Sequence, residues 1–398
     1  MSNPESLDVV IVGGGFAGVT AARKLSEDPR INVTLISLSE CFEYHASLYR
    51  SATGRSKLEV AVPLYEIFEG TEVQIVIDKV TKIDEKKKVL TTGAMKKFKY
   101  DKLVLAAGTV TDYFGIKGLP EFSYGIKTID EAIRLKNHLH AELTTGHKPD
   151  LNYVVVGAGP SGTELAGELV SYLTKLRKSH KINKPFQVDL IEAAPRILPA
   201  LPERFSRSVE KRLSKLGVNI YPSTAVKGES ADSLQLPQGS IDTHTVIWTA
   251  GMSNAPLFAD HPKLFKLGKG KKVDVDSHLK AGKNIWVAGD SANSSKTGWA
   301  QTAVYDGSYI AGNIIRELDG ERASDYSPKD PIGAIPVGPN WCAVNIHGQQ
   351  FYGYLGWVIR RWSDFKLFRS VMPFGLAIRS WLMGNVVEET CSVCRSRQ

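Results

Sequence analysis

The sequence predicts an α/β fold with two Rossmann-like dinucleotide-binding units and a helical segment at the carboxyl end. Two observations carry this prediction. A β-branched apolar run leads directly into a glycine-rich turn and a helix at residues 8–25, and the same order recurs at residues 153–169. The chain has 398 residues, which is too long for one compact core, so two or three domains are expected.

The composition is that of an ordinary soluble chain, with 42% hydrophobic and 23% charged residues. The net charge of +8 is a modest basic excess. No nucleic-acid recognition motif accompanies it, so no nucleic-acid partner is expected. Residues 1–8 are polar and acidic, unlike a signal peptide, and residues 9–22 are too short and too rich in glycine for a membrane span.

Each glycine-rich turn has the spacing GxGxxG, whose glycines serve a tight turn, a close approach of the backbone to a pyrophosphate, and a helix–strand contact. They are Gly13, Gly15 and Gly18 in the first turn and Gly157, Gly159 and Gly162 in the second. The positive end of the following helix then faces the phosphates. One such turn can merely pack a helix on a sheet, but two in the same setting predict two dinucleotides, one per unit.

The residue that ends the second strand of each unit bears on which nucleotide binds. A carboxylate there accepts a hydrogen bond from a free ribose 2′-OH and repels a 2′-phosphate. In the second unit this residue is Glu192, which predicts NADH rather than NADPH, although Arg196 nearby leaves open a contact with a 2′-phosphate or with acidic neighbours. In the first unit the strand ends at Ser37 and the nearest carboxylate is Glu40, so the adenosine-ribose ligand stays open.

Three further apolar strands end in a turn of small residues or at an acidic residue, as parts of a flavin site would. The strand YDKLVLAAGT ends in a turn at Gly108, which would let the backbone pass close under a nucleotide phosphate. The strand TVIWTAG has the same form, ends at Gly251, and would close the NADH unit. The strand NIWVAGDSA places Asp290 at its end, where the carboxylate could accept a hydrogen bond from a ribityl hydroxyl.

Taken in order, these segments resemble the flavoproteins with two dinucleotide-binding domains, and within them the type II NADH dehydrogenases, which are single-subunit NADH:quinone oxidoreductases. The resemblance is carried by GGGFAG, LAAGT, GAGPSGTELAGEL, IEAAPRILP, IWTAG, WVAGD and WAQTAVYDG and covers nearly the whole chain. It implies an FAD-binding domain in two parts, residues 1–112 and 282–330, around an NADH-binding domain at residues 113–281. Residues 331–398 would form a membrane-association segment.

The resemblance also implies a set of site residues. Around FAD it places Gly13, Gly15, Gly18, Gly108 and Asp290, and around NADH it places Gly157, Gly159, Gly162, Glu192 and Gly251. Glu164 matches a carboxylate between the NADH helix and the quinone side of the flavin. A glutamate that the helix dipole favours near a helix start is the alternative.

A quinone site is implied by the start of the motif AQxAxQ, at Ala300 and Gln301. Tyr305 stands where the second Gln is expected, and it could still donate a hydrogen bond to a quinone and stack on its ring. Packing of the helix start near the flavin is the alternative for both side chains. The amides around Ala300 could stabilise negative charge on the reduced flavin.

The carboxyl-terminal segment combines aromatic and basic residues. Within residues 352–382, apolar side chains recur every three or four positions, at Leu355, Val358, Trp362, Phe365, Phe368 and Met372. Basic side chains lie between them, at Arg360, Arg361, Lys366 and Arg369. Two amphipathic helices, broken at Pro373, are therefore expected to lie on an anionic membrane surface. Packing on the body of the protein or across a homodimer is the alternative.

These patterns together predict a peripheral FAD enzyme at the cytoplasmic face of the membrane. It would transfer a hydride from NADH to flavin and two electrons on to a membrane quinone, without proton pumping. Other flavoenzymes stay open, namely a sulfide:quinone oxidoreductase or a single-cysteine NADH oxidase or peroxidase that uses Cys41. A non-enzymatic NADH sensor related to apoptosis-inducing factor is a further alternative.

The chain has four cysteines, too few and too unevenly placed for a disulfide scaffold. Cys391 and Cys394 form a CxxC pair near the end of the chain. Cys342 and His347 are the conceivable further metal ligands in the sequence. No metal is therefore predicted, and the last residues are expected to form a loose tail.

Overall fold

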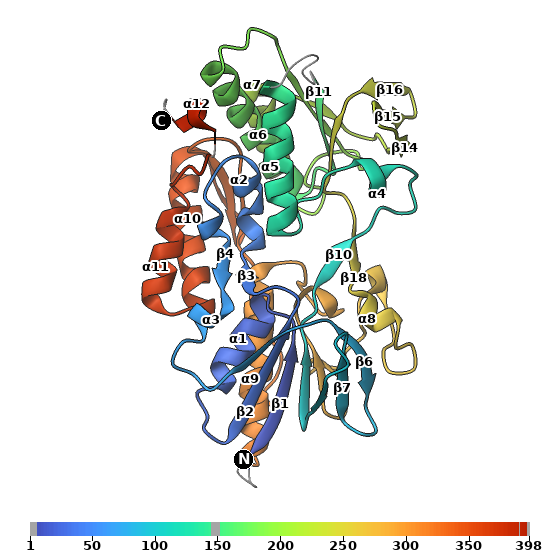
Figure 1. Cartoon of the computed structure of the whole chain (residues 1–398), viewed down its shortest axis with the longest axis vertical. Coiled ribbons are helices and arrows are strands. Elements are labelled where there is room, and N and C mark those ends of the chain that lie inside the picture. The colour runs from blue at the N-terminus through green and yellow to red at the C-terminus, as the bar shows by residue number, and fades with distance from the viewer. Residues whose placement is uncertain (1–5, 145–151, 390, 396–398) are drawn as a thin grey trace.

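The computed structural model describes residues 6–144, 152–389 and 391–395. Figure 1 shows two α/β units stacked along the long axis, with the carboxyl-terminal helices against one side of both. The expected order of strand, glycine turn and helix is confirmed at both places. The α/β fold class is therefore confirmed.

The first unit is built on a six-stranded sheet in the order β19-β20-β9-β1-β2-β5, parallel except for β19. Its strands are β1 (Leu7–Val12), β2 (Ile31–Ser37), β5 (Gln74–Ile77), β9 (Lys102–Leu105), β19 (Lys280–Gly282) and β20 (Ile285–Val287). Val9 and Ile11 enter one core, and Val10 and Val12 enter another. These four residues belong to β1, whose apolar run is continuous because both faces of the sheet are covered.

Two long helices, α1 (Phe16–Leu25) and α9 (Ala300–Leu318), pack side by side on this sheet. They approach closely at Gly307, where an added Cβ would lie 2.2 Å from the carbonyl oxygen of Ala17. The smaller elements of the unit are β3 (Cys41–Glu43), η1 (His45–Ser47), α2 (Leu48–Ala52), η2 (Lys57–Glu59), β4 (Ala61–Pro63), α3 (Leu64–Ile67), β6 (Val80–Asp84), β7 (Val89–Thr92), β8 (Lys97–Lys99) and η4 (Gly289–Ser291).

The second unit has a parallel four-stranded sheet in the order β13-β12-β11-β17. These strands are β11 (Asn152–Val156), β12 (Gln187–Ile191), β13 (Val218–Tyr221) and β17 (Thr245–Trp248). The other elements of this unit are α4 (Leu119–Phe122), α5 (Ile129–Thr144), α6 (Pro160–Ser179), α7 (Glu203–Leu216), β14 (Gly228–Glu229), β15 (Ser233–Leu236) and β16 (Gly239–Asp242). Two short elements that follow in the chain, α8 (Pro256–Ala259) and η3 (Lys269–Lys271), lie beside the first unit, where α8 packs on β6. An antiparallel pair, β10 (Thr109–Thr111) and β18 (Met252–Asn254), connects the two units.

The carboxyl-terminal segment begins with a three-stranded sheet of β21 (Gly333–Pro336), β22 (Cys342–Ile346) and β23 (Gln349–Phe351). Three helices follow, α10 (Gly353–Val371), α11 (Phe374–Met383) and the short α12 (Ser392–Arg395). The expected break lies at Pro373, between α10 and α11. Within the described residues, no helix combines the length and the apolar character that crossing a membrane requires.

The expected single apolar face of α10 is wrong. Phe368 and Met372 are fully buried, whereas Leu355 and Trp362 are 57% and 61% exposed. Arg361, expected beside the apolar face, is itself buried. The buried residues recur at helical spacing on the side that packs against both units, so the helix divides its apolar residues between an inner and an outer face.

Candidate functional site

The first glycine turn has the backbone that its sequence predicts. Gly13 has φ +116°, and a Cβ there would lie 2.1 Å from the carbonyl oxygen of Ala106. A Cβ on Gly18 would lie 1.9 Å from the carbonyl oxygen of Gly13, so helix and strand touch at this point. Gly15 precedes α1, a Cβ there would have no neighbouring atom within 4 Å, and the first-turn amides have no side-chain cap. These amides form an open cradle that fits a pyrophosphate.

The second glycine turn repeats this geometry. Gly157 has φ +100°, and its Cβ would lie 2.6 Å from the Cα of Ala250. A Cβ on Gly162 would lie 1.9 Å from the carbonyl oxygen of Gly157. Gly159 precedes α6 and is open in the same way as its counterpart in the first turn. Both cradles therefore fit a dinucleotide phosphate at a helix start.

Glu192 follows β12 and lies against the second cradle. Its two carboxylate oxygens accept hydrogen bonds from the backbone amides of Ala158, at 2.7 Å, and Ala194, at 2.8 Å. Among the residues that the structure describes, Arg196 has no acidic partner. Its guanidinium donates to the Ser206 hydroxyl and to the carbonyl oxygens of Leu198, Pro199 and Leu201.

The strand ends around the first cradle bring Gly108 and the η4 turn together. Gly108 has φ +67°, and its carbonyl oxygen accepts a hydrogen bond from the Ser291 hydroxyl at 3.1 Å. Asp290 is next to this serine and interacts electrostatically with Lys127. Burial lowers the pKa of Lys127, and the negative charge of Asp290 opposes that shift. The ammonium of Lys127 donates to the Thr109 hydroxyl at 2.8 Å.

Gly251 serves the connection between the two units. A Cβ there would lie 1.8 Å from the carbonyl oxygen of Asp112, and the two residues also share a backbone hydrogen bond of 3.1 Å. Because Gly251 has no side chain, the segment that contains it can pass close to the backbone at Asp112. Lys127 could not be recognised from the sequence, because a single lysine before a helix has no distinctive spacing.

Glu164 is buried near the start of α6, with 6% exposure. Its Oε1 lies 3.6 Å from Nη1 of Arg360, which belongs to α10. Burial raises the pKa of Glu164 to about 8, and the positive charge of Arg360 only partly opposes that effect. Burial therefore favours the protonated form of the Glu164 carboxyl.

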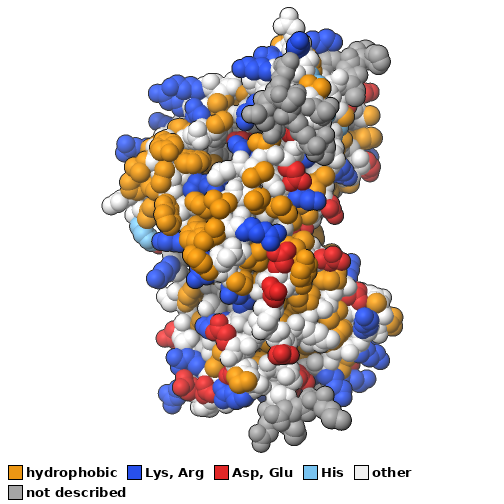
Figure 2. All heavy atoms as spheres, turned by 60° about the vertical axis from the view of Figure 1, so that its left-hand side comes forward, with side chains coloured by type: hydrophobic (Ala, Val, Ile, Leu, Met, Phe, Trp, Pro, Cys, Tyr) orange, Lys and Arg blue, Asp and Glu red, His pale blue; other side chains and the backbone are white. Residues whose placement is uncertain are grey.

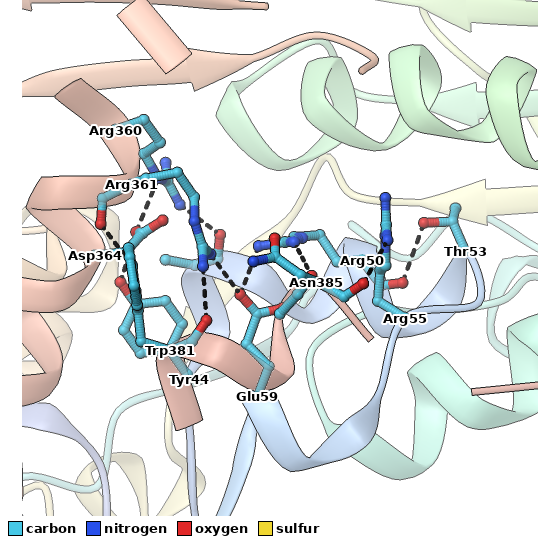
Figure 3. Close-up of polar contacts among 12 residues, drawn as sticks. Tyr44, Arg50, Thr53, Arg55, Glu59, Arg360, Arg361, Asp364, Trp381 and Asn385 are labelled. Atoms are coloured by element: carbon cyan, nitrogen blue, oxygen red, sulfur yellow. Dashed lines mark hydrogen bonds and ion pairs between the residues drawn. The ribbon is translucent and has the colours of Figure 1, made fainter. Parts of the chain in front are cut away.

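Arg360 is the centre of a buried polar network (Figure 3). Its Nε donates to Oδ1 of Asp364 at 2.9 Å, and its other nitrogens donate to the carbonyl oxygens of Ala334 and Ala46. The same carboxylate oxygen of Asp364 accepts from the hydroxyl of Tyr44 at 2.8 Å. These bonds join α10 to the segment that precedes α2.

A second buried group centres on Glu59, which is fully buried. Its carboxylate pairs with Arg50 at 2.5 Å and with Arg361 at 3.5 Å (Figure 3). Arg361 also donates to the carbonyl oxygen of Trp381, whose indole N–H donates back to the carbonyl oxygen of Arg361. Arg361 of α10 thus attaches the carboxyl-terminal helices to the first unit through its ion pair with Glu59.

Gln301 and Tyr305 lie one turn apart on α9. The Gln301 amide accepts from the backbone N–H of Ile332 at 3.1 Å and donates to the carbonyl oxygen of the same residue at 3.2 Å. The Tyr305 hydroxyl accepts from the backbone N–H of Ser327 at 3.2 Å, and its ring packs on Tyr326. Both side chains therefore hold the segment that follows α9. The amides at the start of α9, from Ala300 on, have no side-chain cap.

The four cysteines are free thiols. Burial and the neighbouring acidic residue Glu43 raise the pKa of the Cys41 thiol. Cys342 is fully buried in β22, and burial raises the pKa of its thiol as well. Raised pKa values disfavour the thiolate that a peroxidase or sulfide cycle needs.

Comparisons with known proteins agree with this geometry. The family model described as pyridine nucleotide-disulphide oxidoreductase matches residues 7–307. The type II NADH:quinone oxidoreductase Ndh of Mycobacterium tuberculosis is 29% identical over 385 residues, covering 89% of this chain and 83% of that protein. The type II NADH:quinone oxidoreductase of Staphylococcus aureus strain NCTC 8325 is 26% identical, covering 93% and 97%.

Solved structures share the fold at lower sequence identity. NDH2 from Plasmodium falciparum in complex with NADH matches with a TM-score of 0.86 and 16% identity, over 95% of this chain and 97% of that chain. The sulfide:quinone oxidoreductase from Aquifex aeolicus matches with a TM-score of 0.77 and 19% identity, over 92% of each chain.

Proposed function

Since the chain belongs to the pyridine nucleotide-disulphide oxidoreductase family, we propose that it is an FAD-dependent NADH:quinone oxidoreductase of the type II class, which pumps no protons. The observation that carries this proposal is the pair of equivalent glycine cradles, at Gly13 and Gly157, each open at a helix start. The relatives named as type II NADH:quinone oxidoreductases match along most of their length, which supports the same activity for this chain.

The two cradles take different dinucleotides in this proposal. The first, with residues 1–112 and 282–330, holds the pyrophosphate of FAD, while Asp290 accepts a hydrogen bond from its ribityl chain. The second, within residues 113–281, holds NADH, and Glu192 contacts the adenosine ribose. Bound there, FAD would accept a hydride from NADH and pass two electrons to the quinone.

Glu164 has the protonation state that quinone reduction needs. Reduction of a quinone to a quinol consumes two protons as well as two electrons. The Glu164 carboxyl is protonated at neutral pH, because burial raises its pKa to about 8. We infer that it supplies one of these protons, and that Arg360 positions it.

Gln301 and Tyr305 would border the quinone. Both hold the segment after α9, and the Tyr305 ring stacks within an aromatic cluster beside it. In this proposal Tyr305 replaces the family's glutamine as a hydrogen-bond donor and a stacking surface. The amides at Ala300 would stabilise negative charge on the reduced flavin.

The outer face of α10 and α11 supports binding at a membrane surface. Its exposed hydrophobic side chains are Tyr354, Leu355, Trp362, Phe374 and Leu382. Lys366 and Arg369 are exposed between them, and Figure 2 shows hydrophobic and basic side chains mixed on this side of the molecule. Bulky apolar residues beside cations suit an anionic lipid interface. We propose peripheral attachment at the cytoplasmic face of the membrane, where a lipid-soluble quinone would be collected.

The redox proposal is tested with the absorbance spectrum of the purified protein. We expect a bound flavin that NADH bleaches and that a quinone analogue restores, and a much weaker response to NADPH. Sulfide in place of NADH should leave the spectrum unchanged. A flavin that stays reduced as a complex with NAD in the presence of quinone would instead indicate a sensor.

The membrane proposal is tested by sedimentation with anionic vesicles. A double variant, Leu355→Ser with Trp362→Ser, should lose vesicle binding and keep its activity with a water-soluble acceptor. Leu38→Ser is a matched control because Leu38 is exposed in the first unit. A homodimer that forms through this face in solution, and that the double variant dissociates, would contradict the membrane assignment.

A further inference from the structure

Four metal-binding side chains meet where the end of the chain reaches the second unit. They are His140, His180, Cys391 and Cys394, and each offers one ligand atom within 4.8 Å of the other three. His140 lies in α5, His180 directly follows α6, and the two cysteines flank the start of α12. Cys342 and His347 are the partners of the CxxC pair that the sequence suggests, whereas the fold supplies two other histidines.

Three sulfur–nitrogen distances within this cluster are close to those of a tetrahedral site. Nε2 of His180 lies 3.3 Å from Sγ of Cys394 and 3.6 Å from Sγ of Cys391. Nε2 of His140 lies 3.7 Å from Sγ of Cys394. A tetrahedral zinc ion with bonds of about 2.3 Å to sulfur and about 2.0 Å to nitrogen separates sulfur and nitrogen ligands by about 3.5 Å. These three separations, with all four ligand atoms within 4.8 Å of one another, fit a single ion.

The surroundings of the cluster favour a metal site as well. Nδ1 of His140 lies 3.4 Å from the hydroxyl of Thr144, so a proton on Nδ1 would leave Nε2 free to bind a metal. The His140 and His180 rings meet edge to face, with an angle of 82° between their planes. Cys394 is buried, so a thiolate there would need a counter-charge.

The tail is already held beside the cluster by bonds that need no metal. The backbone N–H of Glu388 donates to the carbonyl oxygen of Gly54 at 2.9 Å, and the ammonium of Lys136 donates to the carbonyl oxygen of Glu388 at 3.0 Å. Lys136 is one turn before His140 on the same helix. Two cysteines three positions apart are thus delivered to the ends of α5 and α6.

We propose that His140, His180, Cys391 and Cys394 bind a structural zinc ion. Two thiolates neutralise the charge of Zn²⁺, and an S₂N₂ tetrahedral set is the coordination that zinc prefers. Because all four ligands come from the protein, the site is closed to substrate. The ion would fasten the end of the chain, which follows the proposed membrane-facing helices, to the second unit.

The experiment measures metal in the full-length, FAD-loaded protein, purified with a reductant from zinc-supplied cells. We expect about one zinc per chain, strongly reduced in Cys394→Ser and His180→Gln. Cys41→Ser and His347→Asn are matched controls outside the cluster and should keep the zinc. Flavin content shows that each variant is folded.

Two further measurements distinguish zinc bound by these four side chains from zinc bound non-specifically. Cobalt exchanged for zinc should give the strong red-region absorption of tetrahedral thiolate coordination, where oxidised flavin does not absorb. A chelator should lower the Tm of the unmodified protein and of the two controls, but not that of Cys394→Ser. Zinc that the cluster variants retain, a cobalt spectrum without thiolate bands, or a Cys391–Cys394 disulfide in the reduced preparation would each overturn the proposal.

Discussion

The protonated state of Glu164 predicts how the stability of the protein depends on pH. Its pKa is about 8 in the folded protein, against 4.5 for an ordinary glutamate. Between these two values the folded state holds a proton at this position that the unfolded chain has released. The free energy of unfolding therefore falls as the pH rises, by about 1.4 kcal/mol per pH unit for this one group. Below pH 4.5 both states are protonated and the group has no effect.

Glu164→Gln isolates this contribution, because glutamine is close in shape to the protonated carboxyl and does not titrate. Below about pH 4.5 we expect the smallest stability difference between the variant and the unmodified protein, and at about pH 5.5 the variant should already have gained about 1.4 kcal/mol over that difference. Two pH units higher, the advantage of the variant should have grown by about 2 to 3 kcal/mol more, because the unmodified protein must take up a proton on folding and free protons become scarcer as the pH rises. Other titrating groups are common to both proteins and cancel in the difference.

The assay is urea unfolding of the FAD-loaded proteins from about pH 5.5 to about 7.5, followed by tryptophan fluorescence. Glu168→Gln is the matched control, one turn further along α6 and half-buried, and it should show no such divergence. A stability difference between Glu164→Gln and the unmodified protein that stays constant over this range would refute the assigned protonation state. So would a variant that is less stable at the high-pH end.

Three further predictions concern single sites. Glu192→Ala should raise the KM for NADH about tenfold and narrow the preference over NADPH, because it removes the ribose contact; steady-state kinetics with both nucleotides would show an unchanged preference if the assignment were wrong. Gln301→Leu and Tyr305→Leu should each impair turnover with quinone more than with a water-soluble acceptor, and equal kinetics with both acceptors would argue against a quinone site there. Tyr44→Phe keeps the stack on Phe368 but removes the bond to Asp364, and should cost about 1 to 2 kcal/mol in urea unfolding.

The parts of the fold that could be predicted from the sequence are those with local causes. The cradle at Gly13 depends on a positive φ and on contacts within a short strand, turn and helix, so the spacing of three glycines is enough to predict it. The break between α10 and α11 likewise follows from one residue, Pro373. In both cases the pattern and its physical cause lie close together in the sequence.

The polar network could not be predicted in this way, because its partners are distant in the sequence. Arg361 and Glu59 are separated by 302 residues, and Tyr44 and Asp364 by 320. In the sequence, arginines among aromatic residues have the same pattern whether they face lipid or a buried carboxylate. The histidines of the proposed zinc site were missed for the same reason, since 254 residues separate His140 from Cys394. The CxxC pair was the visible signal, and the fold was needed to identify its partners.

The two faces of α10 decide how membrane binding can be tested. Deletion of residues 352–398 would remove Arg361 and would leave Glu59 buried without this partner. Removal of one partner from a buried ion pair typically costs about 3 to 5 kcal/mol, and the deletion also uncovers the apolar surface under Phe368. We therefore expect the truncated chain to be insoluble or to lack flavin, which would report on folding rather than on lipid. A soluble, flavin-loaded truncated protein would show that the inner face of α10 is dispensable and would contradict this account of the network.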